Sequence, residues 1–139
     1  MLVPKRTKYR KHFRDRGGLA GQARTGNQIS FGSYALKATS SGEVSSRQIE
    51  SARQTISRYV KRGGKMWIRI FPHTPITRKA AEVPMGSGKG SVDFYVARIL
   101  PGTVIFELDG VTEAQAKEAF RLASHKFSCG VRFVSKFDS

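Results

Sequence analysis

The sequence predicts an α+β fold of two layers, in which two helices cover a mostly antiparallel sheet. Two segments carry apolar residues at spacings of three and four, and each begins with a capping box. Segments between them alternate apolar and polar side chains, as half-buried strands do. The predicted order is strand, helix, strand, long loop, hairpin, helix, strand. This order lacks the regular strand–helix alternation of a parallel sheet.

The first elements follow a pliable connector, residues 17–27, which contains four glycines and no periodicity. Residues 28–38, QISFGSYALKA, predict a strand with an irregularity at Gly32, and residues 39–44 predict a polar turn. A helix should then begin at the capping box of Ser45 and Gln48. Glycines 63 and 64 should end it. Its apolar stripe is Ile49, Ala52, Ile56 and Val60, and the opposite face carries Arg47, Arg58, Lys61 and Arg62.

The segment KMWIRIF at 65–71 predicts a strand with one aliphatic face and one aromatic and cationic face. Trp67 on the second face has two interpretations. It could stack on nucleic-acid bases, or it could pack beneath a helix, which is the commoner use of a strand aromatic. We favour packing.

Residues 72–90, PHTPITRKAAEVPMGSGKG, show no secondary-structure period and predict a long loop, which at this length is usually functional or disordered. The tip at 85–90, MGSGKG, differs from a Walker A loop. Val83 stands where that motif needs glycine, and Lys89 is followed by Gly90 instead of a hydroxyl residue. A glycine-rich tip still allows the backbone to approach a phosphate or a base closely. The positive charges of the loop are Arg78, Lys79 and Lys89.

The last third of the chain predicts a hairpin, a helix and a strand. Residues 92–97 and 104–108 alternate on either side of a Pro101–Gly102 turn, which predicts an antiparallel hairpin. A second capping box, Thr112 with Gln115, begins a helix whose apolar face is Ala116, Ala119, Phe120 and Ala123. After Gly130, residues 131–137 predict the final strand.

The chain is strongly basic: 25 Lys and Arg residues against 10 Asp and Glu give a net charge of +15. Seven of the cations lie within the first sixteen residues, where almost nothing can build a core. Such an arm repels itself unless a polyanion cancels its charge. Basic arms and basic helix faces are typical of nucleic-acid-binding proteins. We therefore expect a basic arm and connector over residues 1–27, and a single α+β RNA-binding domain over residues 28–139.

Catalytic groups form no constellation in the sequence. His12, His73 and His125 fall on the arm, the loop and a helix end, with no nucleophile or paired carboxylate spaced beside them. We interpret His125 as a partner of the helix dipole. The single cysteine, Cys129, excludes an internal disulfide and a cysteine-rich zinc site, and is interpreted as a small buried hydrophobe. We therefore predict no enzyme, no metal and no cofactor. A cationic nuclease is the competing class, and a DNA-compacting protein is a third possibility.

Several segments resemble the bacterial-type large-subunit ribosomal proteins of the L-sixteen family (universal L-sixteen / L-ten-e), and the resemblance covers essentially the whole chain in order. They are MLVPKRTKYRK at 1–11, SFGSYALK at 30–37, RQIESAR at 47–53, GKMWIRIFP at 64–72, MGSGKG at 85–90, PGTVIFE at 101–107 and AKEAFRLA at 116–123.

The resemblance implies a hammerhead-type α+β fold, present as one copy in each large subunit. The implied partners are large-subunit rRNA, the A-site tRNA with the P-site tRNA as a second candidate, and neighbouring ribosomal proteins. A membrane partner is not expected, since no apolar run approaches the roughly 18 residues of a membrane span. A homo-oligomer is not expected either, since the resemblance implies one copy in each large subunit. The implied location is the large ribosomal subunit, either in the bacterial cytoplasm or in a plastid or mitochondrion that encodes the protein.

The resemblance also implies which residues meet RNA. The residues implied to bind rRNA are Lys5, Arg6, Lys8, Arg10, Lys11, Arg14, Arg16, Arg24, Arg47, Arg58, Lys61, Arg62 and Lys65. Those implied to lie on a loop near tRNA and the peptidyl transferase region are Arg78, Lys79, Met85, Gly86, Gly88, Lys89 and Gly90. The family commonly has basic residues where this chain has Pro84 and Ser87, so this tip carries up to two fewer positive charges. Modification of an arginine at the first of these positions cannot occur here.

Overall fold

In the computed structural model, the described residues are 2–5, 21–23, 26–61, 63–78 and 91–137. They form two helices and seven strands. In chain order these are β1 Tyr34–Ala38, β2 Gly42–Ser45, α1 Ser46–Val60, β3 Lys65–Ile68, β4 Thr74–Arg78, β5 Ser91–Ile99, β6 Val104–Asp109, α2 Glu113–Ser124 and β7 Val131–Ser135.

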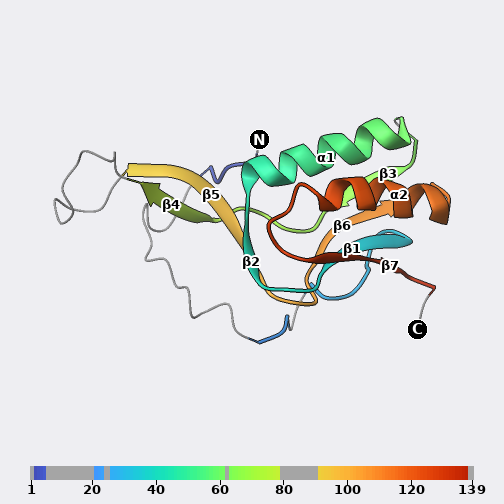
Figure 1. The fold of residues 1–139 in the computed structure, drawn as a ribbon, viewed down its shortest axis with the longest axis horizontal. Coiled ribbons are helices and arrows are strands. Elements are labelled where there is room, and N and C mark those ends of the chain that lie inside the picture. The colour runs from blue at the N-terminus through green and yellow to red at the C-terminus, as the bar shows by residue number, and fades with distance from the viewer. Residues whose placement is uncertain (1, 6–20, 24–25, 62, 79–90, 138–139) are drawn as a thin grey trace.

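The strands form two antiparallel sheets. The four-stranded sheet has the order β3-β6-β1-β7, and the three-stranded sheet has the order β2-β5-β4. Figure 1 shows α1 and α2 side by side over one face of the four-stranded sheet. The α+β class is confirmed, as is antiparallel pairing among the described strands. The strands are divided between two sheets, whereas the sequence analysis expected one.

Both helices begin where their capping boxes predict. The hydroxyl of Ser45 accepts the N–H of Gln48, and the Gln48 side chain accepts the N–H of Ser45. Thr112 and Gln115 make the same reciprocal pair at α2. Each pair satisfies two amides that a helix start leaves without intrahelical partners.

The core lies between the helices and the two sheets, because buried residues of β2 and β5 join those of β1 and β6 in one cluster. Ile49, Ala52 and Ile56 of α1 are buried, as predicted, and Val60 is half-buried. All four predicted residues of α2 are buried as well. Phe106 and Leu108 of β6 pack in the same cluster. Burying each large side chain of this kind contributes about 1.5–3 kcal/mol.

The predicted hairpin of residues 92–108 is wrong. The chain does turn at Pro101–Gly102, but β5 pairs with β2 and β4, while β6 pairs with β1 and β3. At the turn, Ala38 donates to Thr103 O (2.8 Å) and accepts from Gly102 N (2.8 Å), so the end of β1 takes the bonds that a hairpin would make. Alternation predicts a strand, but the choice of its partners depends on the whole sheet.

Two segments read as turn and loop contain short strands. Within the predicted polar turn at 39–44, residues from Gly42 onward form β2 against β5. Within the predicted loop at 72–90, Thr74–Arg78 form β4, also against β5. The prolines in this segment are unfavourable in most strands, so the sequence analysis did not predict this second strand. Pro75 is tolerated because β4 lies at the edge of its sheet, where a missing N–H costs least.

Three boundaries also differ from the prediction. The strand predicted at 28–38 begins only at Tyr34, because the backbone before it bonds elsewhere. The strand predicted at 65–71 ends at Ile68, although Arg69 still donates its N–H to Ile105 O at 2.8 Å. The last strand ends at Ser135, two residues early. The strand predicted over residues 92–97 is confirmed and lies within β5.

Candidate nucleic-acid interface

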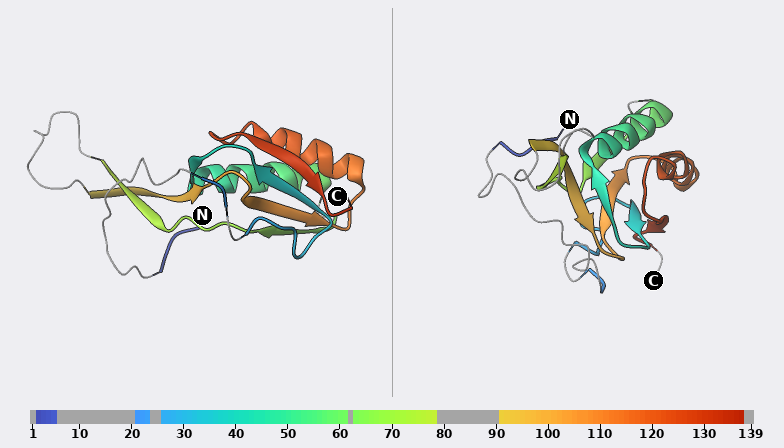
Figure 2. Two further views of the ribbon diagram at one scale, coloured as in Figure 1. Left: turned by 90° about the horizontal axis from the view of Figure 1, so that it is seen from below. Right: turned by 60° about the vertical axis from the view of Figure 1, so that its left-hand side comes forward.

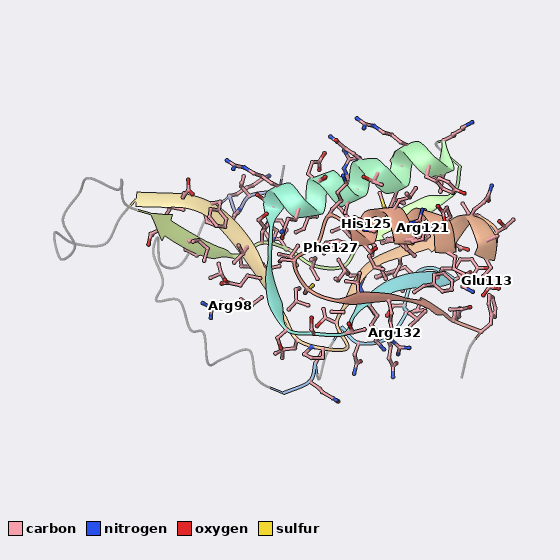
Figure 3. The ribbon with its side chains drawn as sticks, viewed as in Figure 1. Arg98, Glu113, Arg121, His125, Phe127 and Arg132 are labelled. Carbon is pink, nitrogen blue, oxygen red and sulfur yellow. The ribbon has the colours of Figure 1, made fainter. Side chains whose placement is uncertain are left out.

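The outer face of α1 carries a row of cations. At about 100° per residue, Arg58 lies about 20° and Lys61 about 40° from Arg47 around the helix axis, on opposite sides of it. The buried stripe lies on the other side of the helix. All three cations are exposed, and no carboxylate among the described residues forms an ion pair with them. Figure 3 shows nitrogen-tipped side chains projecting from this outer side of α1.

The row spans about 21 Å along the axis, at about 1.5 Å per residue. Its last member, Lys61, caps the helix in the left-handed conformation, with φ 51°. The helix therefore ends before Gly63, where the sequence had placed its stop. Lys65 and Lys5 are exposed too. These exposed cations can meet phosphates without first breaking a salt bridge.

Other arginines of the two helices are already neutralised. Arg53 donates to Glu50 through Nε at 3.0 Å, and Arg121 donates to Glu118 at 3.0 and 2.7 Å. Hydrogen bonds from these guanidinium groups hold the pKa of each glutamate below its usual range. The structure thus separates paired arginines from the unpaired row on α1, a distinction that the sequence alone did not give.

The remaining predicted site residues lie outside the described residues. For rRNA these are Arg6, Lys8, Arg10, Lys11, Arg14, Arg16, Arg24 and Arg62, and for the loop they are Lys79, Met85, Gly86, Gly88, Lys89 and Gly90. Arg78 is the last residue of β4 and pairs in register with Ser91 of β5. The ends of β4 and β5 that border residues 79–90 project far from the two helices, at the left of Figure 1 and of the left view in Figure 2. The two strand ends that border residues 79–90 therefore lie away from the core.

The sequence analysis missed a second basic cluster, on the face of the four-stranded sheet away from the helices. Lys37 of β1 and Arg132 of β7 are direct cross-strand partners. Like charges in that position destabilise a sheet unless an anion compensates them. Together with Lys136 they line a cavity of about 490 Å³. Figure 3 shows Arg132 on the side opposite the helices. The sequence does indicate that the two basic residues of VRFVSK at 131–136 share one face of a strand. It does not indicate which strand lies beside that one.

A buried carboxylate organises the same outer face. Glu107 of β6 is fully buried, and its Oε1 accepts the N–H groups of Ser30, Phe31 and Gly32 at 3.1, 2.8 and 2.8 Å. Its Oε2 accepts from Arg69. Burial alone would raise the pKa of Glu107, but these bonds to the charged form outweigh it, and the pKa lies below its usual range.

This arrangement explains why residues 30–32 are not a strand: their amides point to a side chain instead of a neighbouring strand. Gly32 is required there, because a Cβ would lie 2.5 Å from Leu108 O. The irregularity predicted at this glycine has that physical cause. The sequence does single out Glu107, because it is the one charged residue in the apolar run VIFEL at 104–108, but the sequence analysis drew no inference from it.

Trp67 packs, as favoured, but not beneath a helix. It pairs with Glu107 across β3 and β6, on the face away from the helices, and stacks on Phe31 with ring centroids 5.9 Å apart. The Arg69 guanidinium carbon lies 5.2 Å from the centroid of the Phe31 ring. The aromatic and cationic face predicted for this strand therefore exists, with Phe31 lying over it.

Catalytic groups are dispersed among the described residues. The His73 ring lies 5.0 Å from the Phe71 ring, between centroids, and is tilted by 44° to it. His125 is the C-cap residue of α2, the position for which a dipole role was predicted. In that part of the chain, no three His, Cys, Asp or Glu side chains lie close enough to hold a metal ion. Cys129 is buried as predicted, and burial raises the pKa of its thiol. No helix within the described residues could span a membrane.

These features define a class: a small, strongly basic α+β protein with exposed cationic surfaces, of the kind that binds nucleic acid structurally. The sequence profile of the family described as ribosomal protein L16p/L10e matches residues 4–134. The chain belongs to this family. Its members are structural ribosomal proteins, so the chain is not an enzyme.

Curated bacterial proteins named large ribosomal subunit protein uL16 are similar over nearly the full length. The protein of Stenotrophomonas maltophilia (strain R551-3) is 59% identical over 137 residues, covering 98% of each chain. Those of Xanthomonas oryzae pv. oryzae (strain PXO99A) and Xanthomonas campestris pv. campestris (strain B100) are each 57% identical over 136 residues, again covering 98% of both chains. The family resemblance seen in the sequence is thereby confirmed.

Proposed function

We propose that this chain binds large-subunit rRNA through its basic arm and through the cation row of α1. It does so as a structural constituent of the large ribosomal subunit, the assembly that its relatives' names give. All three relatives described above are bacterial, which favours the cytoplasmic ribosome over an organellar one. Neighbouring ribosomal proteins are the expected protein partners.

The observation that carries the proposal is the exposed, unpaired state of Arg47, Arg58 and Lys61 on the helix face opposite the core. Phosphates meeting this row would release their condensed counterions, which makes binding favourable and salt-dependent. The arm contributes the same chemistry through Lys5 and its other cations. Lys65 adds an exposed cation after the helix, and Arg62 is a further expected phosphate contact. With about eight phosphate contacts, log K should fall against log salt with a slope of roughly −7.

The second part of the proposal concerns tRNA. The β4–β5 ribbon ends at Arg78 and Ser91, which border the segment with Lys79, Met85 and Lys89, and these strand ends lie far from the two helices. A glycine-rich segment at the end of such a ribbon suits close approach to an RNA backbone. We propose that it lies near the A-site tRNA and the peptidyl transferase region, with the P-site tRNA as a second candidate. Pro84 and Ser87 leave this tip less charged than in most of the family.

Salt titration of the full-length protein against protein-free large-subunit rRNA tests the rRNA contact. The triple variant R47Q/R58Q/K61Q should reduce the magnitude of the slope by up to roughly 2.7, at about 0.9 per lost contact. R53Q is the matched control on the same helix, because Arg53 already pairs with Glu50. Its slope should match the wild type. A triple variant with the wild-type slope would refute the role of the α1 row.

Sedimentation tests the assembly itself. In a sucrose gradient of cell extract, the wild-type protein should travel with the large subunit, and the triple variant should shift toward the top fractions as salt rises. Migration with the nucleoid instead would support the DNA-compacting alternative.

A further inference from the structure

One exposed aromatic ring on the outer sheet face has no role in the core. Phe31 is 58% exposed, although it lies within the segment whose amides Glu107 binds. Trp67 and Arg69 are two residues apart, so they point to the same face, and Phe31 contacts both of them. The indole and the guanidinium therefore both lie against the Phe31 ring, and more than half of the Phe31 surface stays open to solvent.

The ring is fixed in place by its surroundings. The amide of Phe31 donates to Glu107, and so do the amides on either side of it. The Glu107 carboxylate also binds Arg69, which in turn donates to Gln28 O at 3.2 Å. A partner that stacks on Phe31 therefore does not need to order the ring first, so little conformational entropy is lost on binding.

We propose that Phe31 is a stacking position for one unpaired RNA base. A single ring beside a guanidinium offers about the area of one base, whereas a protein partner would require a wider apolar surface. The surrounding charge also fits RNA, because Arg69 adjoins the ring and the Lys37–Arg132–Lys136 cluster lies on the same face of the sheet. Bases stack on aromatic side chains regardless of sequence, so the site would select unpaired RNA over duplex. This inference rests on the proposed rRNA binding and adds a base contact to its phosphate contacts.

The test compares two ligands of equal charge: an oligouridylate of about twelve nucleotides and an abasic ribose-phosphate strand of the same length. Binding to the full-length protein is followed by the fluorescence of Trp67, the only tryptophan, which contacts Phe31. The wild type should bind the oligouridylate about tenfold more tightly than the abasic strand. Phe31→Leu keeps an apolar contact to Trp67 and should lose this preference. Phe31→Tyr should restore it, and the salt slope should be equal in all three proteins.

The outcomes separate this inference from the proposed function. If Phe31→Leu, folded by circular dichroism, keeps the wild-type preference, the stacking position is wrong while phosphate binding stands. The same holds if the wild type binds both strands equally. If neither strand binds at low salt, the proposed function fails and the stacking position fails with it. If Phe31→Leu binds both strands as the wild type does but drops out of large-subunit particles, the ring contacts a protein, and the proposal is overturned.

Discussion

Replacing Glu107 by glutamine is the sharpest test of how the outer sheet face is held together. The substitution keeps the shape of the side chain and removes its charge. The amide oxygen can still accept from Ser30, Phe31 and Gly32, but the amide nitrogen is a donor, and it would face the donor of Arg69. A buried attraction thus becomes a contact between two donors, and a guanidinium loses its counter-charge.

The magnitude follows from these contacts. Breaking one side of a buried ion pair costs about 3–5 kcal/mol. The side chain of Arg69 keeps 18% of its exposure and a bond to Gln28 O, which reduces that cost. Against this, three hydrogen bonds to a carboxylate become weaker hydrogen bonds to a neutral amide, which offsets that reduction. We expect a loss of about 3–5 kcal/mol in the free energy of unfolding, a large part of the roughly 5–15 kcal/mol typical of a domain.

Urea unfolding at neutral pH, followed by far-ultraviolet circular dichroism and by Trp67 fluorescence, measures this loss. Glu118→Gln is the matched control, because Glu118 pairs with Arg121 on the exposed surface of α2. That variant should unfold at the wild-type urea concentration. A Glu107→Gln protein within about 1 kcal/mol of the wild type would refute the reasoning. It would mean that water, and not Glu107, satisfies the amides of residues 30–32.

Three further predictions follow from single positions. The folded-state pKa of Glu107 is depressed, so the stability that its charge contributes is complete above the ordinary glutamate pKa of about 4.3 and is lost as pH falls through the lower folded-state pKa. Urea unfolding from neutral pH to about pH 3 should therefore show the stabilities of the wild type and Glu107→Gln converging, and a constant difference between them would contradict this. Lys61→Gly should raise the free energy of unfolding by about 1 kcal/mol, because φ 51° strains a non-glycine residue, and should reduce the magnitude of the salt slope for rRNA by about 0.9. Urea unfolding measures the first effect and salt titration the second, and an unchanged slope would show that Lys61 is not part of the interface. Gly64→Ala should lower the free energy of unfolding by more than about 2 kcal/mol, since φ is 74° and a Cβ would lie 2.3 Å from Asp109 O. The control is Gly63→Ala, whose Cβ would lie 3.1 Å from Val60 O, and thermal unfolding should show a much smaller loss of stability for it; equal losses would contradict the steric cause.

The helices show what local pattern can predict. The capping boxes at Ser45 and Thr112 involve residues three positions apart, so their geometry is complete within one turn. The buried stripes follow because helical spacing places such residues on one face. The same reasoning put Arg47, Arg58 and Lys61 on the exposed side of α1, where the structure places them.

The strands show where local pattern stops. Alternation located β5 and β6 but paired them with each other, because nothing local distinguishes a hairpin from two strands that turn into separate sheets. β4 was missed because its proline is tolerated only at a sheet edge, and edge position is a property of the assembled sheet. The candidate interface divides in the same way. The charge of α1 was predicted, whereas the Lys37–Arg132 pair required the register between β1 and β7.

The sequence by itself determined that this protein is a basic α+β chain of a ribosomal family, with two capped helices and a cationic helix face. These properties depend on composition and on spacings of a few residues, which the chain carries before it folds. Only the tertiary structure decided that Glu107, more than seventy residues distant along the chain, holds the amides of Ser30–Gly32 and presents Phe31 above Trp67. Contacts over such a separation depend on strand order and register, and those are fixed only when the whole sheet closes around its core.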